Sequence, residues 1–241
     1  LLYFRIVTKF FKNLFRLILI KTPWFIILNY IKNFLPNYKT KNKSKIIEDQ
    51  IYKNFSTTNL NHKWFCNNLN FLGNSFKDVF GIKNILEIGS YEGRSALFFL
   101  NNFKDANIHC VDTWSGSDEH DNFDFNKIEK NFDFNSSIFQ LNNRLKKFKM
   151  TSNEFFFNNS KKYDLIFVDG DHSSAQVKSD INNSWKILNK GGYLILDDYL
   201  WWFYKDLKKN PSTSINSFII NYISEIDSLK IWHQVIIKKN I

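Results

Sequence analysis

Cysteine, proline and glycine are scarce in this chain of 241 residues, which holds two, three and eight of them respectively. Cys66 and Cys110 are too far apart in sequence to form a Cys-x-x-Cys metal or redox pair. Two isolated thiols are typical of a reducing compartment, so a cytoplasmic location is expected. Hydrophobic residues make up 44% of the chain, which suffices for a buried core.

Acidic residues are absent from the first 45 positions. Residues 1–45 hold ten of the 33 Lys and Arg residues and none of the 23 Asp and Glu residues. The other 196 positions therefore balance at 23 against 23, although the whole chain carries a net charge of +10. A nucleic-acid enzyme needs basic surface around its active site to neutralise phosphates. The neutral remainder argues against a nucleic-acid partner.

The basic N-terminal segment has the pattern of amphipathic helices. On a helical projection, four basic residues share one side and six large apolar residues crowd the other. The two sets are Arg5, Lys9, Lys12 and Arg16 against Phe4, Val7, Phe11, Leu14, Phe15 and Ile18. Pro23 interrupts the pattern, residues 24–35 form a second apolar stretch, and residues 37–45 read as a basic linker. Residues 1–45 are thus predicted to be a helical arm and linker.

Two roles are open for the predicted helices. Residues 1–35 can lie on an anionic surface as a peripheral contact with the inner face of a membrane. Arg16 and Lys21 interrupt the apolar run that a transmembrane helix would need. Alternatively, the helices fold over the rest of the chain as a lid or dimer contact. The chain begins with Leu1, so a preceding signal or anchor also stays open, as does the oligomeric state.

The most informative stretch is a short apolar run, residues 84–88, followed by Gly89 and Gly93. Residues 94–100 then resume helical spacing. A strand, a glycine turn and a helix start present free backbone N–H groups above the strand, which favours a nucleotide-type cofactor. The Gly-x-Gly-x-x-Gly fingerprint of dinucleotide sites is missing, and Glu87 would repel a pyrophosphate. An NAD-dependent oxidoreductase is therefore a weaker alternative.

Acidic residues follow three further predicted strands. Residues 108–111 end at Asp112, a position where a carboxylate can accept both ribose hydroxyls, with Thr113 and Trp114 beside the adenosine. Residues 163–168 end at Asp169, and residues 193–196 end at Asp197 and Asp198.

Parallel strands end at one edge of a sheet, so these acids are expected around one crevice. Asp169, Asp197 and Asp198 could supply oxygen ligands to Mg²⁺. His172 leaves the same strand end as Asp169 and is the candidate general base.

Four stretches together resemble class I S-adenosylmethionine-dependent methyltransferases, and more closely the small-molecule and sugar O-methyltransferases that include the macrocin type. The stretches are residues 85–95, 110–116, 167–173 and 196–199, within a similarity over about residues 64–235 that includes Pro211, Ile215, Phe218, Gln234 and Val235. The resemblance implies a Rossmann-like α/β fold, a mostly parallel sheet with helices on both faces. The chain departs from the family pattern at Ser174, a position that an aromatic residue often occupies in the family.

The resemblance also implies roles for individual residues. S-adenosylmethionine would be held by Glu87, Gly89, Ser90, Gly93, Asp112, Thr113, Trp114 and Asp169. Mg²⁺ would be held by Asp169, Asp197 and Asp198, and His172 would deprotonate a hydroxyl of a small, sugar-containing acceptor. Residues 46–241 would form this catalytic domain. The chain lacks the Asn/Asp-Pro-Pro-aromatic motif of amine methylation. The alternative from another class is a non-catalytic, membrane-associated module that retains the fold.

The remaining elements are predicted more coarsely. Residues 46–80 read as helical pieces, 121–147 as a helical insertion, and 173–188 and 214–223 as helices. The third strand is expected to end within residues 150–154, where Ser152 would contact the adenine. Residues 230–238 are strand-like, and the pattern does not decide between one strand and two.

Overall fold

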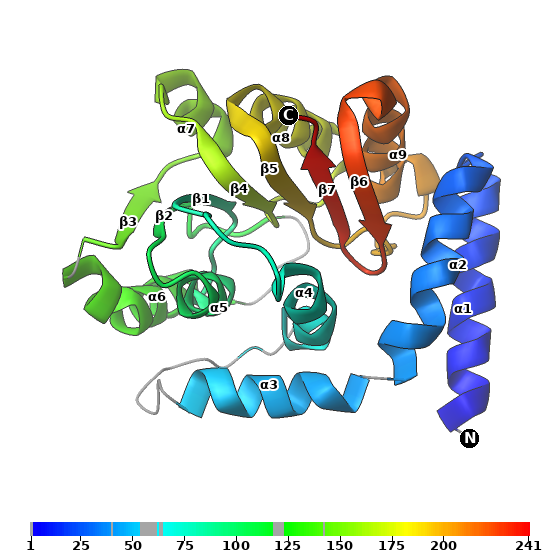
Figure 1. The fold of residues 1–241 in the computed structure, drawn as a ribbon, viewed down its shortest axis with the longest axis horizontal. Helices are drawn as coiled ribbons and strands as arrows, with labels where there is room; N and C mark the ends of the chain where they lie inside the picture. The colour runs from blue at the N-terminus through cyan, green and yellow to red at the C-terminus, as the bar shows by residue number, and fades with distance from the viewer. Residues whose placement is uncertain (1, 40, 54–61, 63–64, 118–122, 142) are drawn as a thin grey trace.

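The computed structural model describes residues 2–39, 41–53, 62, 65–117, 123–141 and 143–241. Within them, seven strands form one sheet in the order β3-β2-β1-β4-β5-β7-β6 (Figure 1). The strands are β1 Asn84–Ile88, β2 Asn107–Asp112, β3 Leu145–Lys149, β4 Tyr163–Val168, β5 Leu188–Leu196, β6 Ile226–Ile231 and β7 Val235–Lys239. Neighbours among β1 to β5 pair in parallel, and β7 runs antiparallel to β5 and to β6. The predicted fold class is confirmed.

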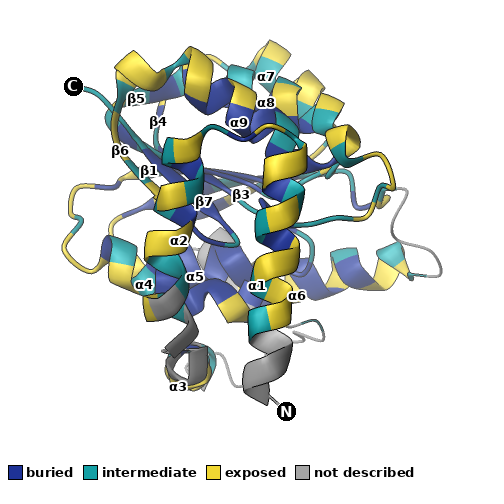
Figure 2. Cartoon of the chain, turned by 90° about the vertical axis from the view of Figure 1, so that its right-hand side faces the viewer, coloured by how far each residue is buried: buried dark blue, intermediate teal, exposed yellow. Residues whose placement is uncertain are grey.

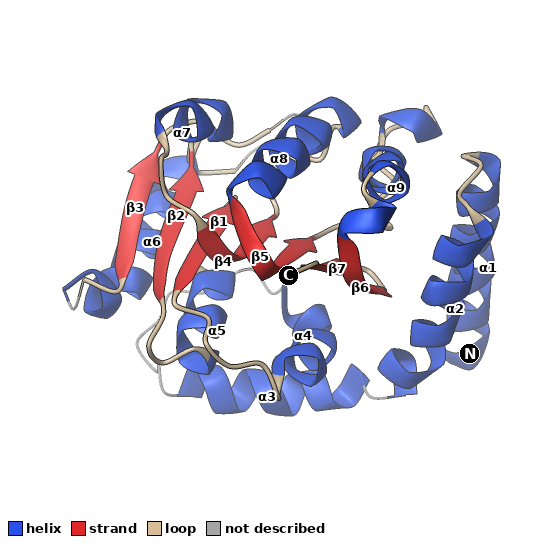
Figure 3. Cartoon of the chain, turned by 45° about the horizontal axis from the view of Figure 1, so that its top comes forward, coloured by secondary structure: helices blue, strands red, loops and turns tan. Residues whose placement is uncertain are grey.

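Helices cover both faces of the sheet, with α7, α8 and α9 on one side and α4, α5 and α6 on the other (Figures 2 and 3). Three short 3-10 helices and nine α-helices occur in the described residues. The α-helices are α1 Leu2–Leu19, α2 Trp24–Lys39, α3 Lys41–Lys53, α4 Leu69–Phe76, α5 Arg94–Asn102, α6 Phe125–Leu141, α7 Ser152–Asn158, α8 Ser174–Ile187 and α9 Pro211–Asn221. The 3-10 helices are Phe65–Asn68, Leu207–Lys209 and Ile223–Glu225.

The central strands read as apolar runs because helices bury both of their faces. Their register aligns their carboxyl ends: Ile88 of β1 pairs with Val111 of β2 and Val168 of β4, and Val168 pairs with Leu196 of β5. The loops after these four strands therefore leave from the same edge of the sheet.

The third strand ends earlier than predicted, at Lys149. Thr151 caps α7, since its hydroxyl accepts from the N–H of Glu154 and the Glu154 carboxylate accepts from the N–H of Thr151. This capping box favours a helix where a strand end was predicted. The predicted helical insertion is also too long, because α6 ends at Leu141 and residues 145–147 belong to β3. Residues 121 and 122 lie outside the described residues.

The predicted linker, residues 37–45, differs from the structure, because it contains the end of α2 and the start of α3. Helix α3 is attached to the rest of the chain, because Ser44 is buried and its Oγ accepts from the N–H of Asn70. The tail that was predicted as one strand or two is the antiparallel hairpin of β6 and β7.

Helices α1 and α2 form a hairpin that packs against β6 at the edge of the sheet (Figure 1). Asn29 of α2 donates through Nδ2 to the carbonyl of Leu229 and accepts through Oδ1 from the N–H of Ile231, both at 2.9 Å. The Tyr30 ring stacks on Trp232 with centroids 6.3 Å apart. In the described residues, no helix combines the length and apolar character needed to cross a membrane.

Candidate active site

A cavity of about 730 Å³ opens at the carboxyl ends of β1, β2, β4 and β5. In open α/β sheets, ligands bind at this edge, and the volume is typical of sites for small molecules and cofactors. Most of the predicted cofactor residues line it: Gly89, Ser90, Asp112, Thr113, Trp114 and Asp169. The predicted metal and base residues Asp197, Asp198 and His172 line it too. The structure thus brings together residues that are more than 100 positions apart in sequence.

Gly89 has a positive φ of 85°, and a Cβ placed on it would lie 2.0 Å from the carbonyl oxygen of Asp169. The strand end of β1 and the strand end of β4 therefore approach each other through backbone alone. Only glycine permits that approach.

Asp112 holds the glycine loop in place. Its Oδ2 accepts from the N–H groups of Ser90 and Tyr91, both at 2.9 Å, and its Oδ1 accepts from the N–H of Trp114 at 2.7 Å. A carboxylate has about four acceptor positions, so capacity remains for a hydroxyl of a bound molecule. The predicted ribose ligand is thus also the residue that shapes the loop around it.

Three non-glycine residues on the cavity lining adopt a positive φ: Tyr91, Trp114 and Asp198, at 48°, 49° and 51°. Such conformations are costly for residues with a Cβ and cluster at functional sites. The indole Nε1 of Trp114 donates to the carbonyl of Tyr91 at 2.9 Å, which couples the two strained turns.

Glu87 and Gly93 are not among the lining residues of the described cavity. Glu87 is fully buried within β1, and burial raises the pKa of its carboxyl to about 7, while nearby Ser95, Ser90 and Cys110 partly offset this. In the described part of the chain, neither Glu87 oxygen has a hydrogen-bond partner in ordinary geometry. Gly93, with φ of 83°, precedes the first residue of α5. Both residues therefore support the glycine loop without lining the cavity.

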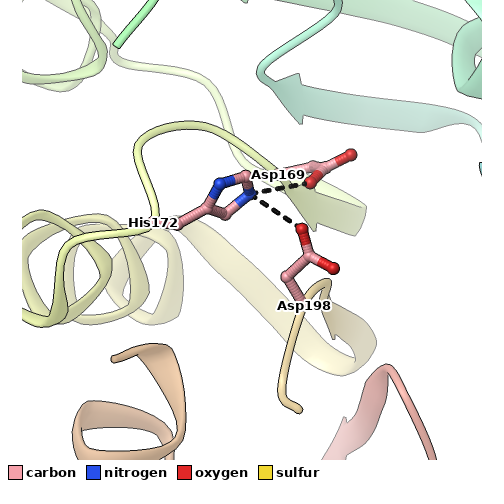
Figure 4. A group of neighbouring side chains, drawn as sticks. All are labelled: Asp169, His172 and Asp198. Carbon is pink, nitrogen blue, oxygen red and sulfur yellow. Dashed lines mark hydrogen bonds and ion pairs between the residues drawn. The ribbon is translucent and has the colours of Figure 1, made fainter. Parts of the chain in front are cut away.

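Asp169, His172 and Asp198 form the acidic centre of the cavity (Figure 4). The imidazole Nε2 of His172 lies 3.4 Å from Asp169 Oδ1 and 3.1 Å from Asp198 Oδ2. One potential ligand atom from each residue lies within 4.8 Å of the others, an arrangement that could hold a metal ion. The sequence predicted Asp197 in this group, whereas the structure brings His172 into it.

Asp197 lies on the cavity wall but outside this group, because hydrogen bonds from other residues hold its carboxylate. Its Oδ2 accepts from Nε2 of Gln234 at 2.8 Å, and its Oδ1 accepts from the N–H of Asp198 at 2.7 Å and from Nδ2 of Asn68 at 3.4 Å. Burial raises the pKa of Asp197 well above its usual range, and the neighbouring charges of Asp169 and Asp198 raise it further. Asp197 therefore orients the turn that carries Asp198.

Sequence reasoning missed a second buried acid, Asp180 of α8. Its side chain lines the cavity and accepts through Oδ1 from Nε2 of Gln176 at 3.0 Å, and the same Nε2 lies 3.1 Å from Oγ of Ser152. Burial raises the pKa of Asp180 to about 6. Ser152, the predicted adenine contact, is thus part of a polar cluster. The four-residue spacing of Gln176 and Asp180 on one helix face was the available signal.

Glu92 and Arg94 were also missed. Glu92 is buried, accepts through Oε1 from Nδ2 of Asn131 at 2.9 Å and lies 3.5 Å from Nδ1 of His62 through Oε2. Arg94 donates through Nε to the carbonyl of His62 at 2.8 Å and through Nη1 to Glu48 of α3 at 3.2 Å. These contacts tie the preceding helical segment to the glycine loop. A charged pair directly beside Gly93 was the sequence signal.

Aromatic side chains form another part of the cavity wall, namely Phe123, Phe125, Trp201 and Phe203. The Trp201 ring lies 4.9 Å from the imidazole of His172, centroid to centroid. Ser174 does not supply an aromatic surface, and its Oγ lies 2.6 Å from Oγ of Ser214. The aromatic group beside His172 therefore comes from the loop after β5.

Residues 86–199 match the sequence family described as a methyltransferase domain. An uncharacterized protein of Acanthamoeba polyphaga mimivirus is 30% identical over 125 residues, which cover 47% of this chain and 50% of that protein. The matched region thus spans about half the length of this viral relative.

Solved structures share the fold at low sequence identity. A Staphylococcus aureus protein that carries the provisional name caffeoyl-CoA O-methyltransferase is 16% identical, with a TM-score of 0.55 over 83% of this chain and 99% of that one. The MycE methyltransferase of the mycinamycin biosynthetic pathway, in complex with Mg, SAH and mycinamycin VI, is 16% identical, with a TM-score of 0.51 over 79% of this chain and 54% of that one. The family match confirms the resemblance to methyltransferases over residues 86–199, and these likenesses confirm the fold.

Proposed function

Since residues 86–199 match a methyltransferase domain, we propose that the chain transfers a methyl group from S-adenosylmethionine to a hydroxyl group of a small, sugar-containing acceptor. One observation carries the proposal: a single cavity joins the glycine loop at Gly89 to the group of Asp169, His172 and Asp198. The MycE methyltransferase, whose complex contains Mg, SAH and mycinamycin VI, supports the choice of cofactor and of a small-molecule acceptor.

The residues around the glycine loop fit S-adenosylmethionine. Ser90 is buried on the cavity wall, and its hydroxyl lies beside the Glu87 carboxyl. Asp112 would accept from the ribose, and Trp114 would lie beside the adenosine. The polar cluster of Ser152, Gln176 and Asp180 would face the adenine. When bound, the cofactor would supply an electrophilic methyl group on its sulfonium.

The donor set at the acidic centre fits a divalent cation. Two carboxylates and an imidazole share one small space, and burial together with the charges of Asp169 and Asp198 raises the pKa of the neighbouring Asp197. Asp169 and Asp198 would hold Mg²⁺, which prefers oxygen ligands. The bound ion would make an acceptor hydroxyl more acidic. Asp197 would keep Asp198 in its strained turn.

His172 would accept the proton of the acceptor hydroxyl at Nε2. The carboxylates of Asp198 and Asp169, at 3.1 and 3.4 Å, would stabilise the imidazolium that forms. Trp201, against the same ring, would limit the access of water and provide a flat surface for an acceptor. The acceptor oxygen that has lost its proton to His172 would then take up the methyl group that the cofactor supplies, and the cofactor would keep the electron pair of its broken carbon–sulfur bond.

Calorimetry with S-adenosylmethionine, with NAD and with Mg²⁺ tests the proposal, followed by assays on a panel of hydroxylated sugars. We expect micromolar binding of S-adenosylmethionine and none of NAD. His172→Asn should keep cofactor affinity within about twofold and lower methyl transfer at least about 100-fold. Asp198→Asn should weaken binding of the metal alone.

Asp227→Asn, at an exposed position on β6, serves as the matched control and should change none of these values. NAD binding in place of S-adenosylmethionine would show an oxidoreductase. Lack of binding of either cofactor would leave the non-catalytic alternative.

A further inference from the structure

The hairpin of α1 and α2 buries one face and leaves the other in solvent. Leu17 of α1 and Ile26 and Tyr30 of α2 are almost completely buried against the rest of the molecule. The rings of Phe10 and Phe34 meet at 4.3 Å between the two helices. Packing within the chain therefore accounts for the inner face alone.

The outer face of the hairpin is rich in large apolar side chains, and both helices turn exposed residues toward the viewer in Figure 2. We define the outer face as Phe11, Phe15, Ile18 and Leu19 of α1 with Trp24, Leu28 and Ile31 of α2. Phe15 is 62% exposed and Trp24 is 73% exposed. Phe11, Phe15 and Ile18 belong to the apolar side of the helix pattern predicted from sequence. The structure turns that side outward, where folding alone gives it no partner.

Charge on the same hairpin is of one sign. Residues 1–45 contain ten basic residues and no acidic residue. Lys12 of α1, Lys21 of the connecting turn and Lys32 of α2 are exposed. A surface that binds here must therefore accept apolar side chains and carry negative charge close to them.

We propose that the outer face is a docking surface for an anionic lipid membrane. The apolar side chains would enter the boundary between headgroups and acyl chains, and the lysines would lie among the phosphates. The helices would lie in the plane of the membrane, in agreement with their charge and with the lack of a spanning helix in the described residues. An exposed patch of this kind marks an interaction site rather than ordinary surface.

The inner side of α1 contacts the loop after β5. The guanidinium of Arg16, at the end of α1, lies 5.3 Å from the ring of Trp202, and the adjacent Trp201 lines the cavity. The docking proposal does not depend on the proposed methyl transfer, and its test uses no enzymatic readout.

Flotation of the 241-residue chain with vesicles tests the docking surface. Vesicles of phosphatidylcholine alone are compared with vesicles that contain about 30% phosphatidylserine, at about 0.1 M salt. We expect binding to the anionic vesicles only. Lys12→Gln combined with Lys32→Gln should weaken it about 25-fold, or about fivefold for each lysine. Phe11→Ser combined with Phe15→Ser should weaken it at least about tenfold.

Phe157→Ser is the matched control, because Phe157 is 91% exposed on α7, at the far side of the sheet from α1 (Figure 1). It should leave binding unchanged, and all variants should retain their circular dichroism spectra. Equal binding to both vesicle types, or none to either, would overturn the proposal. The proposal would also be overturned if the chain bound no vesicles and light scattering showed a dimer that Phe11→Ser combined with Phe15→Ser dissociates. That result would assign the outer face to a second copy of the chain.

Discussion

Gly89 lies where two strand ends meet with no side chain between them. Its Cβ would overlap the carbonyl of Asp169, so the backbone after β1 and the backbone after β4 have a fixed separation. That separation determines how far the glycine loop stands from the acidic centre. The positive φ of Tyr91, Trp114 and Asp198 around the same cavity shows that several residues keep costly conformations there.

Gly89→Ala should destabilise the chain by at least about 2 kcal/mol, because it adds a backbone overlap to the cost of a positive φ. Gly81→Ala is the control, since Gly81 has φ of 81° and nothing within 4 Å of the added Cβ. It should cost only about 1 kcal/mol. Urea denaturation of the two variants measures the difference. Equal losses would show that the contact with Asp169 relaxes freely.

Asp180 should make the stability of the chain depend on pH. Burial raises its pKa from 3.8 to about 6, so between these values the folded chain holds a proton that the unfolded chain has released. Stability should therefore fall as pH rises from about 4 to 6. Asp180→Asn should increase the free energy of unfolding by about 2–3 kcal/mol at pH 7.5 and by little at pH 4. Asp227→Asn should show no such dependence, and an equal gain at both pH values would exclude charge as the cause.

At the scale of elements, Asn29 decides where α2 is attached. Its amide bonds both the carbonyl of Leu229 and the N–H of Ile231, so it pairs with the edge strand β6 as a neighbouring backbone would. The stacked Tyr30 and Trp232 add apolar contact at the same place. Burial also raises the pKa of Tyr30 to about 12. The helical hairpin is thus joined to the sheet by specific contacts.

Asn29→Ala should cost about 1–3 kcal/mol, because it leaves backbone groups of β6 without their partner in a partly buried place. Asn158→Ala is the control, since the Asn158 side chain is exposed and bonds only locally, to the carbonyl of Glu154 in α7. Chemical denaturation compares the two. A loss no larger than the control's would mean that α2 contributes little to the stability of β6.

At the scale of the whole molecule, the N-terminal hairpin belongs to the packed structure. Leu17 and Ile26 join the same buried cluster as Ile231 and Trp232. The sequence predicts an arm over residues 1–45 and a catalytic domain over residues 46–241. Whether the catalytic domain folds without the arm can be tested by deletion.

Removal of residues 1–39 should lower the melting temperature by at least about 10 °C or cause aggregation, because it uncovers Trp232 and Ile231. The 241-residue chain with Phe11→Ser and Phe15→Ser is the control and should melt within about 2 °C of the unaltered chain. Differential scanning calorimetry gives both values. A deleted chain that melts normally as a monomer would show an independent catalytic domain.

Much of the fold and part of the site follow from short-range sequence patterns. The apolar runs before Gly89, Asp112, Asp169 and Asp197 predicted the central parallel strands, and parallel pairing places their ends at one edge whatever the side chains do. The end of the third strand was predicted too late in the sequence. Thr151 and Glu154 form a capping box there, and its signal competes with the strand pattern. Gln176 and Asp180 were missed because the sequence does not show which face of their helix lines the cavity.

The sequence alone determined which residue types stand at the strand ends and which side of α1 is apolar, since both depend on periodicity over a few residues. Tertiary structure decided the directions of the side chains. At the turn of Asp198, which has a positive φ, the Asp197 carboxylate meets Gln234 and the Asp198 carboxylate meets His172. Packing of Tyr30 on Trp232 turns the outer face into solvent. These outcomes depend on contacts between distant segments, which no local pattern encodes.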